Sequence, residues 1–126
     1  YGDPFFRQTY PWDNVDEVDK GGRIRQRYKN MIKLRNSSKA FSIGDFECVH
    51  KVGHVYGFVR CYHDEKYLIV ANLGTREERA RVDVARYGMR KLKCQTSDDN
   101  SLLESSDGIH FIDMPRLWIK VYKVEK

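Results

Sequence analysis

The chain has 126 residues, of which 33% are charged and 13% aromatic, and its 23 Lys and Arg against 18 Asp and Glu give a net charge of +5. This length suits one domain with a short appendage and excludes two full domains. The aromatic content excludes a disordered chain, and the scattering of both charge signs argues against a nucleic-acid partner. The longest uncharged apolar run, at 67–73, is far shorter than the roughly 20 residues of a membrane span, so no membrane partner is expected.

The first 19 residues are predicted to form an irregular segment. They hold two of the three prolines of the chain, Pro4 and Pro11, and a proline fixes φ and removes a backbone donor. The chain opens on Tyr1 and not on Met. This start indicates processing, an engineered chain or a fragment of a longer protein.

Residues 22–36 show the periodicity of one amphipathic helix. Ile24, Tyr28, Met31 and Ile32 follow the spacing of a single helix face, and cations and amides fill the other positions. An apolar helix face has to pack against another element. It either covers the β-rich half that follows or has its partner upstream of Tyr1.

Beyond residue 40, short β-branched and aromatic runs recur about every ten residues, with glycines at or near the turns. The predicted strands cover 46–51, 55–62, 66–72, 80–84, 89–93, 109–114 and 117–124. This spacing is typical of an antiparallel sandwich. We expect a mainly β fold, an antiparallel Greek-key β-sandwich preceded by an irregular segment and one helix, with a domain boundary between residues 39 and 40.

The three cysteines, Cys48, Cys61 and Cys94, are an odd number without close spacing. This pattern argues against a disulfide framework and favours a reducing compartment. A cytoplasmic location is expected, and secretion stays open.

A zinc site is conceivable because Cys48 and His50, like Cys61 and His63, are two residues apart and would share a strand face. In an even-length hairpin, however, Cys48 opposes Val59, and the four ligands lie too far apart to meet at one ion. We expect no metal and no cofactor.

No complete catalytic set is found in the sequence. The acidic pairs at 16–17, 77–78 and 98–99 are sequence neighbours in polar surroundings, whereas hydrolysis by acid and base needs two carboxylates that converge across a substrate.

Two further features could bind a ligand. The arginines of the predicted helix are spread around the helix and do not line one face, which favours a solvated surface over a row of cations that binds the phosphates of a nucleic acid. Trp118 is either a core residue or a platform for a sugar ring.

The opening segment reads GDPFFRQTYPW at 2–12 and resembles the G-D-P-x-x-R-R-x-x-x-W motif near the end of the catalytic barrel in the alpha-amylase superfamily. It is most similar to the neopullulanase, cyclomaltodextrinase and maltogenic amylase group. Later motifs keep the family's order: YKNMIKLR at 28–35 is similar to its last barrel helix, GDF at 44–46 to a strand start, VYGFVR at 55–60 to VYAFAR, and LIVAN at 68–72 to VVLN. The resemblance covers nearly the whole chain.

The resemblance implies a C-terminal fragment of a glycoside hydrolase. Residues 1–39 would be the last loop and helix of a (β/α)8 barrel, and 40–126 the sandwich called domain C. The family's catalytic acids lie upstream, so the fragment would support the missing barrel and be inactive alone. Its parent would act on an α-glucan such as starch, maltooligosaccharide, pullulan or cyclodextrin.

The resemblance also implies one substrate-binding pair. Asp3 and Arg7, the aspartate and arginine of the D-P-x-x-R motif, would hydrogen-bond hydroxyls of a glucose unit away from the cleaved bond. A structural ion pair within the loop is the alternative. For the chain as a whole, the alternatives are a stand-alone carbohydrate-binding or interaction module of sandwich fold and, with less support, a nucleic-acid-binding domain.

Overall fold

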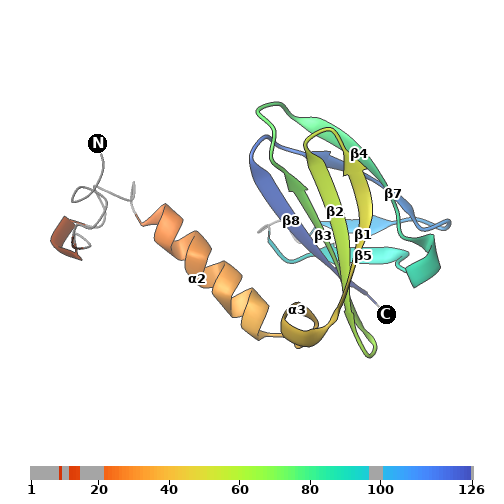
Figure 1. The fold of residues 1–126 in the computed structure, drawn as a ribbon, viewed down its shortest axis with the longest axis horizontal. Helices are drawn as coiled ribbons and strands as arrows, with labels where there is room; N and C mark the ends of the chain where they lie inside the picture. Colours follow the sequence, from red (N-terminus) through yellow and green to blue (C-terminus); the bar gives the residue numbers. More distant parts are fainter. Residues whose placement is uncertain (1–8, 10–11, 15–21, 97–100, 126) are drawn as a thin grey trace. The chain divides into compact units, whose positions relative to one another are not determined.

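The structure, a computed structural model, describes residues 9, 12–14, 22–96 and 101–125. The chain separates into two compact units, residues 1–33 and residues 34–126. The first contains the short 3-10 helix η2 (Trp12–Asn14) and most of helix α2 (Arg23–Asn36), and the second contains the strands (Figure 1). The domain boundary expected between residues 39 and 40 stays a prediction.

Helix α2 confirms the helix predicted at 22–36. It begins after Gly22, whose φ of +74° lies in the left-handed region that favours glycine. At its end, the Ser37 hydroxyl donates to the Leu34 carbonyl at 2.6 Å. None of the residues of α2 is buried. Neither α2 nor any other described helix is long and apolar enough to cross a membrane.

A second, four-residue helix, α3 (Ala40–Ile43), was not predicted. Its first turn is held by Ser38, whose hydroxyl accepts from the Ala40 amide at 3.1 Å and donates to the Glu65 carboxylate at 2.6 Å. Ala40 is completely buried. Four residues are too few to show a helical period, so α3 forms because tertiary contacts hold it.

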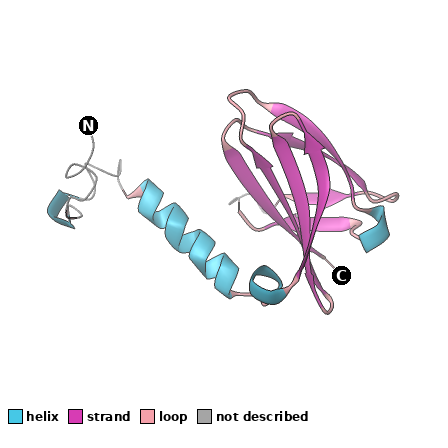
Figure 2. Cartoon of the chain, viewed as in Figure 1, coloured by secondary structure: helices cyan, strands magenta, loops and turns pink. Residues whose placement is uncertain are grey.

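Eight strands follow, and every pairing between them is antiparallel. They are β1 (Asp45–Val52), β2 (Val55–Tyr62), β3 (Glu65–Asn72), β4 (Glu78–Asp83), β5 (Lys91–Cys94), β6 (Leu102–Glu104), β7 (Ile109–Met114) and β8 (Trp118–Val124). Seven match the predicted runs, and β6 is the strand that was missed. Figure 2 shows that strands dominate this unit.

The strands form a six-stranded sheet in the order β1-β2-β3-β8-β5-β6 and a two-stranded sheet of β4 and β7. The chain leaves the large sheet after β3 to form β4, and again after β6 to form β7, before β8 returns between β3 and β5. A 3-10 helix, η3 (Ala85–Tyr87), follows β4. This arrangement confirms the predicted antiparallel β-sandwich.

The core lies between the two sheets. Val59, Leu68 and Val70 come from the large sheet, and Val82 and Ile112 from the small one. In β4 and β7, buried and exposed residues alternate along the strand, as expected when one face meets the core and the other meets water. The sandwich therefore has a core of its own.

One buried amide connects the two sheets. Asn72, at the end of β3, is completely buried. Its side-chain nitrogen donates to the carbonyls of Arg76 at 2.9 Å and Met114 at 3.1 Å, and its oxygen accepts from the Gly74 amide at 2.9 Å. Because Met114 ends β7, this side chain joins the large sheet to the small one.

Candidate docking surface

The large sheet has an apolar face on the side turned away from β4 and β7. Along β3, Leu68 and Val70 belong to the core between the sheets, so Tyr67 and Ile69 point to the opposite side. Both are nevertheless buried. Helix α3 covers part of this side, since the rings of Phe41 and Tyr67 are 4.4 Å apart. The sandwich thus has a second apolar layer outside its core.

Strand register places further apolar residues on this side. Phe58 pairs with Ile69, which pairs with Val121, and in the next row Tyr56 pairs with Ala71, which pairs with Ile119. At the edge, the Phe46 ring lies 5.0 Å from the Phe58 ring and is 62% exposed. We call this surface the outer sheet face; its members are Phe46, Tyr56, Phe58, Ile69, Ala71, Ile119 and Val121. Of these residues, Phe46 and Ile119 are exposed, Ile69 and Val121 are buried, and the other three are partly buried. Adjoining apolar residues that stay partly exposed are typical of an interaction surface.

A row of cations borders the outer sheet face. Across the strands, Arg60 pairs with Tyr67, Tyr67 with Lys123, and Lys123 with Lys93. The Lys123 ammonium is 5.8 Å from the Tyr67 ring centre. Two lysines directly opposite each other repel, which disfavours a second cationic element on this border.

Helix α2 carries a separate apolar stripe. Ile24, Tyr28 and Ile32 are 57%, 68% and 56% exposed, and Met31 on the same arc is partly exposed. A soluble helix gains most of its stability from packing such a stripe against a neighbour. The α2 stripe is thus a second candidate docking surface, described apart from the sandwich.

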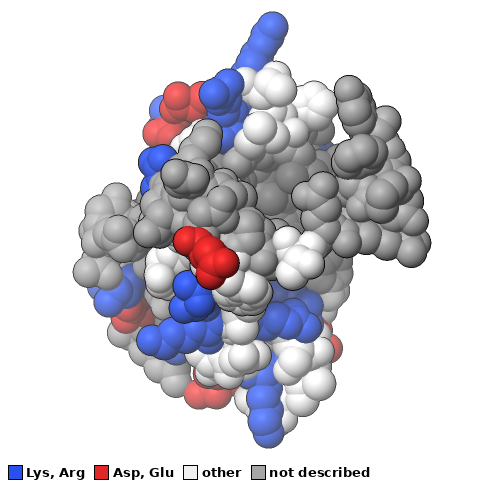
Figure 3. Space-filling view, turned by 90° about the vertical axis from the view of Figure 1, so that its left-hand side faces the viewer, with Lys and Arg blue, Asp and Glu red and all other residues white. Residues whose placement is uncertain are grey.

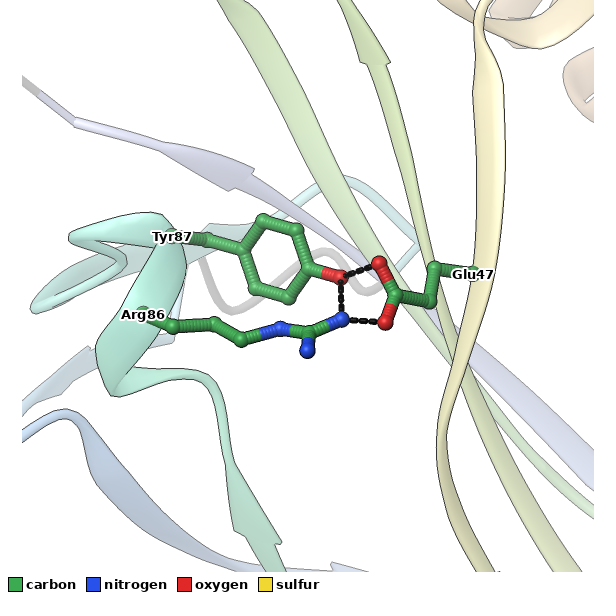
Figure 4. Close-up of polar contacts among 3 residues, drawn as sticks. All are labelled: Glu47, Arg86 and Tyr87. Atoms are coloured by element: carbon green, nitrogen blue, oxygen red, sulfur yellow. Dashed lines mark hydrogen bonds and ion pairs between the residues drawn. The ribbon is translucent and has the colours of Figure 1, made fainter.

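A polar cluster lies at the edge of the sandwich and joins β1 to η3. Figure 4 shows the Tyr87 hydroxyl donating to the Glu47 carboxylate, with Arg86 paired to the same carboxylate and donating to the Tyr87 oxygen at 2.7 Å. Lys66 of β3 also donates to the Tyr87 carbonyl at 2.7 Å. The Glu47 and Arg86 side chains are about half exposed or more, so this cluster is a surface contact between η3 and the large sheet whose ion pair adds little stability.

The cysteine and histidine pairs considered for zinc do not lie in the expected register. Val52 does face Val55, but a β-bulge between Cys48 and His50 makes Cys48 face Phe58 and Glu47 face Val59. The expectation that Cys48 opposes Val59 was therefore wrong, because a bulge adds one residue to one strand. Cys48 is exposed and Cys61 partly buried, and burial raises the pKa of the Cys61 thiol. Within the described ranges, no three His, Cys, Asp or Glu side chains could hold a metal ion.

Asp3 and Arg7, the predicted substrate-binding pair, lie outside the described residues. Trp118, considered as core or sugar platform, is partly buried at the start of β8. Sequence reasoning identified the α2 stripe but not the outer sheet face. The alternation of residues 67–70 is hidden because all four are apolar and buried.

No family model matches the chain. Amylopullulanase from Thermoanaerobacterium thermosulfurigenes is 23% identical over 127 aligned residues, which cover 91% of this chain. The amylopullulanase from Thermoanaerobacterium saccharolyticum is 23% identical over 96 aligned residues, which cover 68% of this chain. The chain spans 7% of the length of each of these relatives.

Solved structures share the fold. An Anoxybacillus alpha-amylase superposes with a TM-score of 0.69 at 21% identity, covering 79% of this chain and 22% of that one. The alpha-amylase of Geobacillus thermoleovorans, complexed with acarbose, superposes with a TM-score of 0.65 at 21% sequence identity. This match covers 74% of this chain and 21% of that one. The chain is similar to alpha-amylase family enzymes over most of its length. A Nostoc punctiforme debranching enzyme from acarbose-soaked crystals superposes with a TM-score of 0.56 at 23% sequence identity. This match covers 74% of this chain and 18% of that one.

Proposed function

We propose that the chain is the C-terminal region of an α-glucan-acting glycoside hydrolase of the alpha-amylase family. Residues 1–39 would complete a catalytic barrel, and residues 40–126 would form a sandwich that supports it. The observation that carries this proposal is the shared fold, which covers 79% of this chain but only 22% of the matching alpha-amylase. The α2 stripe and the outer sheet face support it, because both are apolar surfaces suited to a neighbouring domain.

In this role the chain does not supply the catalytic acids. Hydrolysis of a glycosidic bond needs two carboxyl groups placed about 5 to 10 Å apart around the substrate. Among the described residues, the Glu47 carboxylate is paired with Arg86 and accepts from the Tyr87 hydroxyl. The Glu65 carboxylate accepts from the Ser38 hydroxyl. The catalytic acids would come from the preceding barrel.

The test compares three proteins: the product of the whole coding region, this chain alone, and the whole protein ended at residue 39 so that it lacks the sandwich. The whole protein should release reducing sugar from maltooligosaccharides, and the isolated chain should release none above the blank. The truncated protein should lose thermal stability together with activity. Hydrolysis by the purified chain alone, or a coding region without a barrel, would refute the proposal.

Within this function, Asp3 and Arg7 are proposed to hold one glucose unit of the substrate. A carboxylate accepts from two hydroxyls and a guanidinium donates in a fixed fork, so the pair suits a sugar ring. In the whole protein, Asp3→Ala or Arg7→Ala should lower kcat/KM for a long oligosaccharide by roughly 1–3 kcal/mol of transition-state stabilisation. Substrates too short to reach this subsite should be affected less. Equal losses on short and long substrates would instead favour an ion pair that only holds the loop.

The second candidate, a stand-alone carbohydrate-binding module, rests on exposed aromatic rings. Phe46 is 62% and Phe111 54% exposed, and the Arg79 guanidinium lies 5.3 Å from the Phe111 ring centre. Binding of maltooligosaccharides by the isolated chain, lost in Phe46→Ala or Phe111→Ala, would favour this reading.

A further inference from the structure

The small sheet carries one exposed aromatic ring among charged side chains on its outward side. Strands β4 and β7 lie side by side (Figure 1), and their residues Ala80 and Ile112 belong to the core. The alternate residues of both strands therefore face away from the core. We call this surface the small-sheet platform; its members are Arg79, Arg81, Asp83, Ile109, Phe111 and Asp113. All of them except Ile109 are exposed.

The Phe111 ring is oriented by a neighbouring guanidinium. Strand register places Arg81 opposite Phe111 and Arg79 opposite Asp113. The Arg79 guanidinium lies 5.3 Å from the Phe111 ring centre, and its Nε atom lies 3.7 Å from the Asp113 carboxylate. A guanidinium over an aromatic ring is attracted to it. The ring and the guanidinium therefore hold each other in place before a ligand binds, which lowers the entropic cost of binding.

This combination of side chains suits a neutral sugar. One side of a pyranose ring presents C–H groups, which can pack against the flat apolar body of Phe111. The hydroxyls at its rim can donate to the Asp113 carboxylate and accept from the Arg79 guanidinium. Asp113 is two positions from Phe111 along β7, about 6.6 Å away, so one sugar can reach both. Because the ion pair between Arg79 and Asp113 is exposed and weak, hydroxyls can share its atoms at little cost.

The charges of the small-sheet platform disfavour other ligands. The platform has two arginines and two aspartates, so it presents no field of one sign to a phosphate or to a cation. On the face seen in Figure 3, by contrast, lysine and arginine side chains are more frequent than acidic ones among the described residues. A second copy of the chain is also disfavoured, because charged residues are depleted at the centre of protein interfaces.

The position of the platform keeps it open in the proposed enzyme. The outer sheet face, which includes the exposed ring of Phe46, is a surface suited to a neighbouring domain. The small-sheet platform lies on the other sheet, with the core between the two. A domain that covers the outer sheet face therefore leaves Phe111 accessible.

With the ligand class taken from the proposed function, we infer that the small-sheet platform binds a glucose unit of an α-glucan chain, with Phe111 as the stacking ring and Arg79 and Asp113 as hydroxyl partners. A single exposed ring binds one sugar weakly. A polymer held by the platform and by the proposed barrel at the same time is bound more tightly than by either contact alone.

The experiment measures the Kd of the whole protein for granular starch, from the fraction that pellets with the starch in the cold. Phe111→Ala should raise this Kd roughly 5- to 20-fold, because it removes the stacking contact and the gain from two linked contacts. Phe111→Trp should bind at least as well as wild type. Phe111→Leu, which keeps an apolar side chain but has no flat ring, should behave like Phe111→Ala.

The control is Leu102→Ala, which removes another exposed apolar side chain, 53% exposed on β6. Its Kd should stay within about twofold of wild type, and the Tm of every variant should stay within about 2 °C, as expected for exposed positions. Arg79→Ala should raise the Kd by a smaller factor than Phe111→Ala, because the ring remains.

An unchanged Kd for Phe111→Ala in a whole protein that hydrolyses α-glucans would overturn this inference and leave the proposed function standing. Equal losses for Phe111→Ala and Leu102→Ala, or binding by Phe111→Leu as tight as by Phe111→Trp, would also overturn it. So would a dimer of the wild-type protein that Phe111→Ala abolishes, since the ring would then serve a second copy. A coding region without a preceding barrel would overturn the proposed function itself.

Discussion

Asn72→Ala is expected to lower the free energy of unfolding of the isolated chain by about 2–4 kcal/mol. The substitution leaves the carbonyls of Arg76 and Met114 and the amide of Gly74 without the partners they have in the structure. The site is completely buried, so water replaces these bonds poorly. Urea unfolding followed by circular dichroism measures the change.

Gln95→Ala is the matched control, because the Gln95 amide also donates to a carbonyl, that of Lys93 at 3.1 Å, but is exposed. It should change stability by less than about 0.5 kcal/mol. Asn72→Asp tests the accepting and the donating atoms of the side chain separately. The new carboxylate can still accept from the Gly74 amide, but it cannot donate to the carbonyls of Arg76 and Met114. Burial would raise its folded-state pKa, so the variant should lose stability as pH rises above the ordinary value of about 3.9. If Asn72→Ala behaves like Gln95→Ala, Asn72 does not hold the sheets together.

Leu68→Ala should lower the free energy of unfolding by about 2–5 kcal/mol, the range for removing a buried leucine side chain. Leu68 is completely buried in the core between the sheets, where the neighbouring strands limit how far a cavity can collapse. The slope of the urea transition should stay unchanged, because the surface exposed on unfolding is nearly the same.

The control for this prediction is Leu73→Ala, five residues along the chain. Leu73 is 64% exposed, and the substitution should cost less than about 0.5 kcal/mol. Comparable losses for the two leucines would mean that the core does not lie between the sheets as described.

The candidate docking surfaces differ in how far sequence alone predicts them. The α2 stripe is evident from the spacing of Ile24, Tyr28 and Ile32, because a helix face depends only on local periodicity. The outer sheet face depends on which strands pair and in which register. Phe58, Ile69 and Val121 come from three strands and form one row only through the β2–β3 and β3–β8 pairings.

Sequence by itself determined the elements whose signals are local. The helix at 22–36 and seven of the strands follow from periodicity and turn residues, and the sandwich follows from their spacing. Tertiary structure alone decided the rest. Helix α3 and strand β6 are too short to carry a period, and the bulge that turns Cys48 toward Phe58 depends on the partner strand. The burial of Asn72 likewise requires β7 to lie beside the end of β3, a contact between residues 42 positions apart. Such contacts depend on how distant segments pair, and local residue patterns do not encode that pairing.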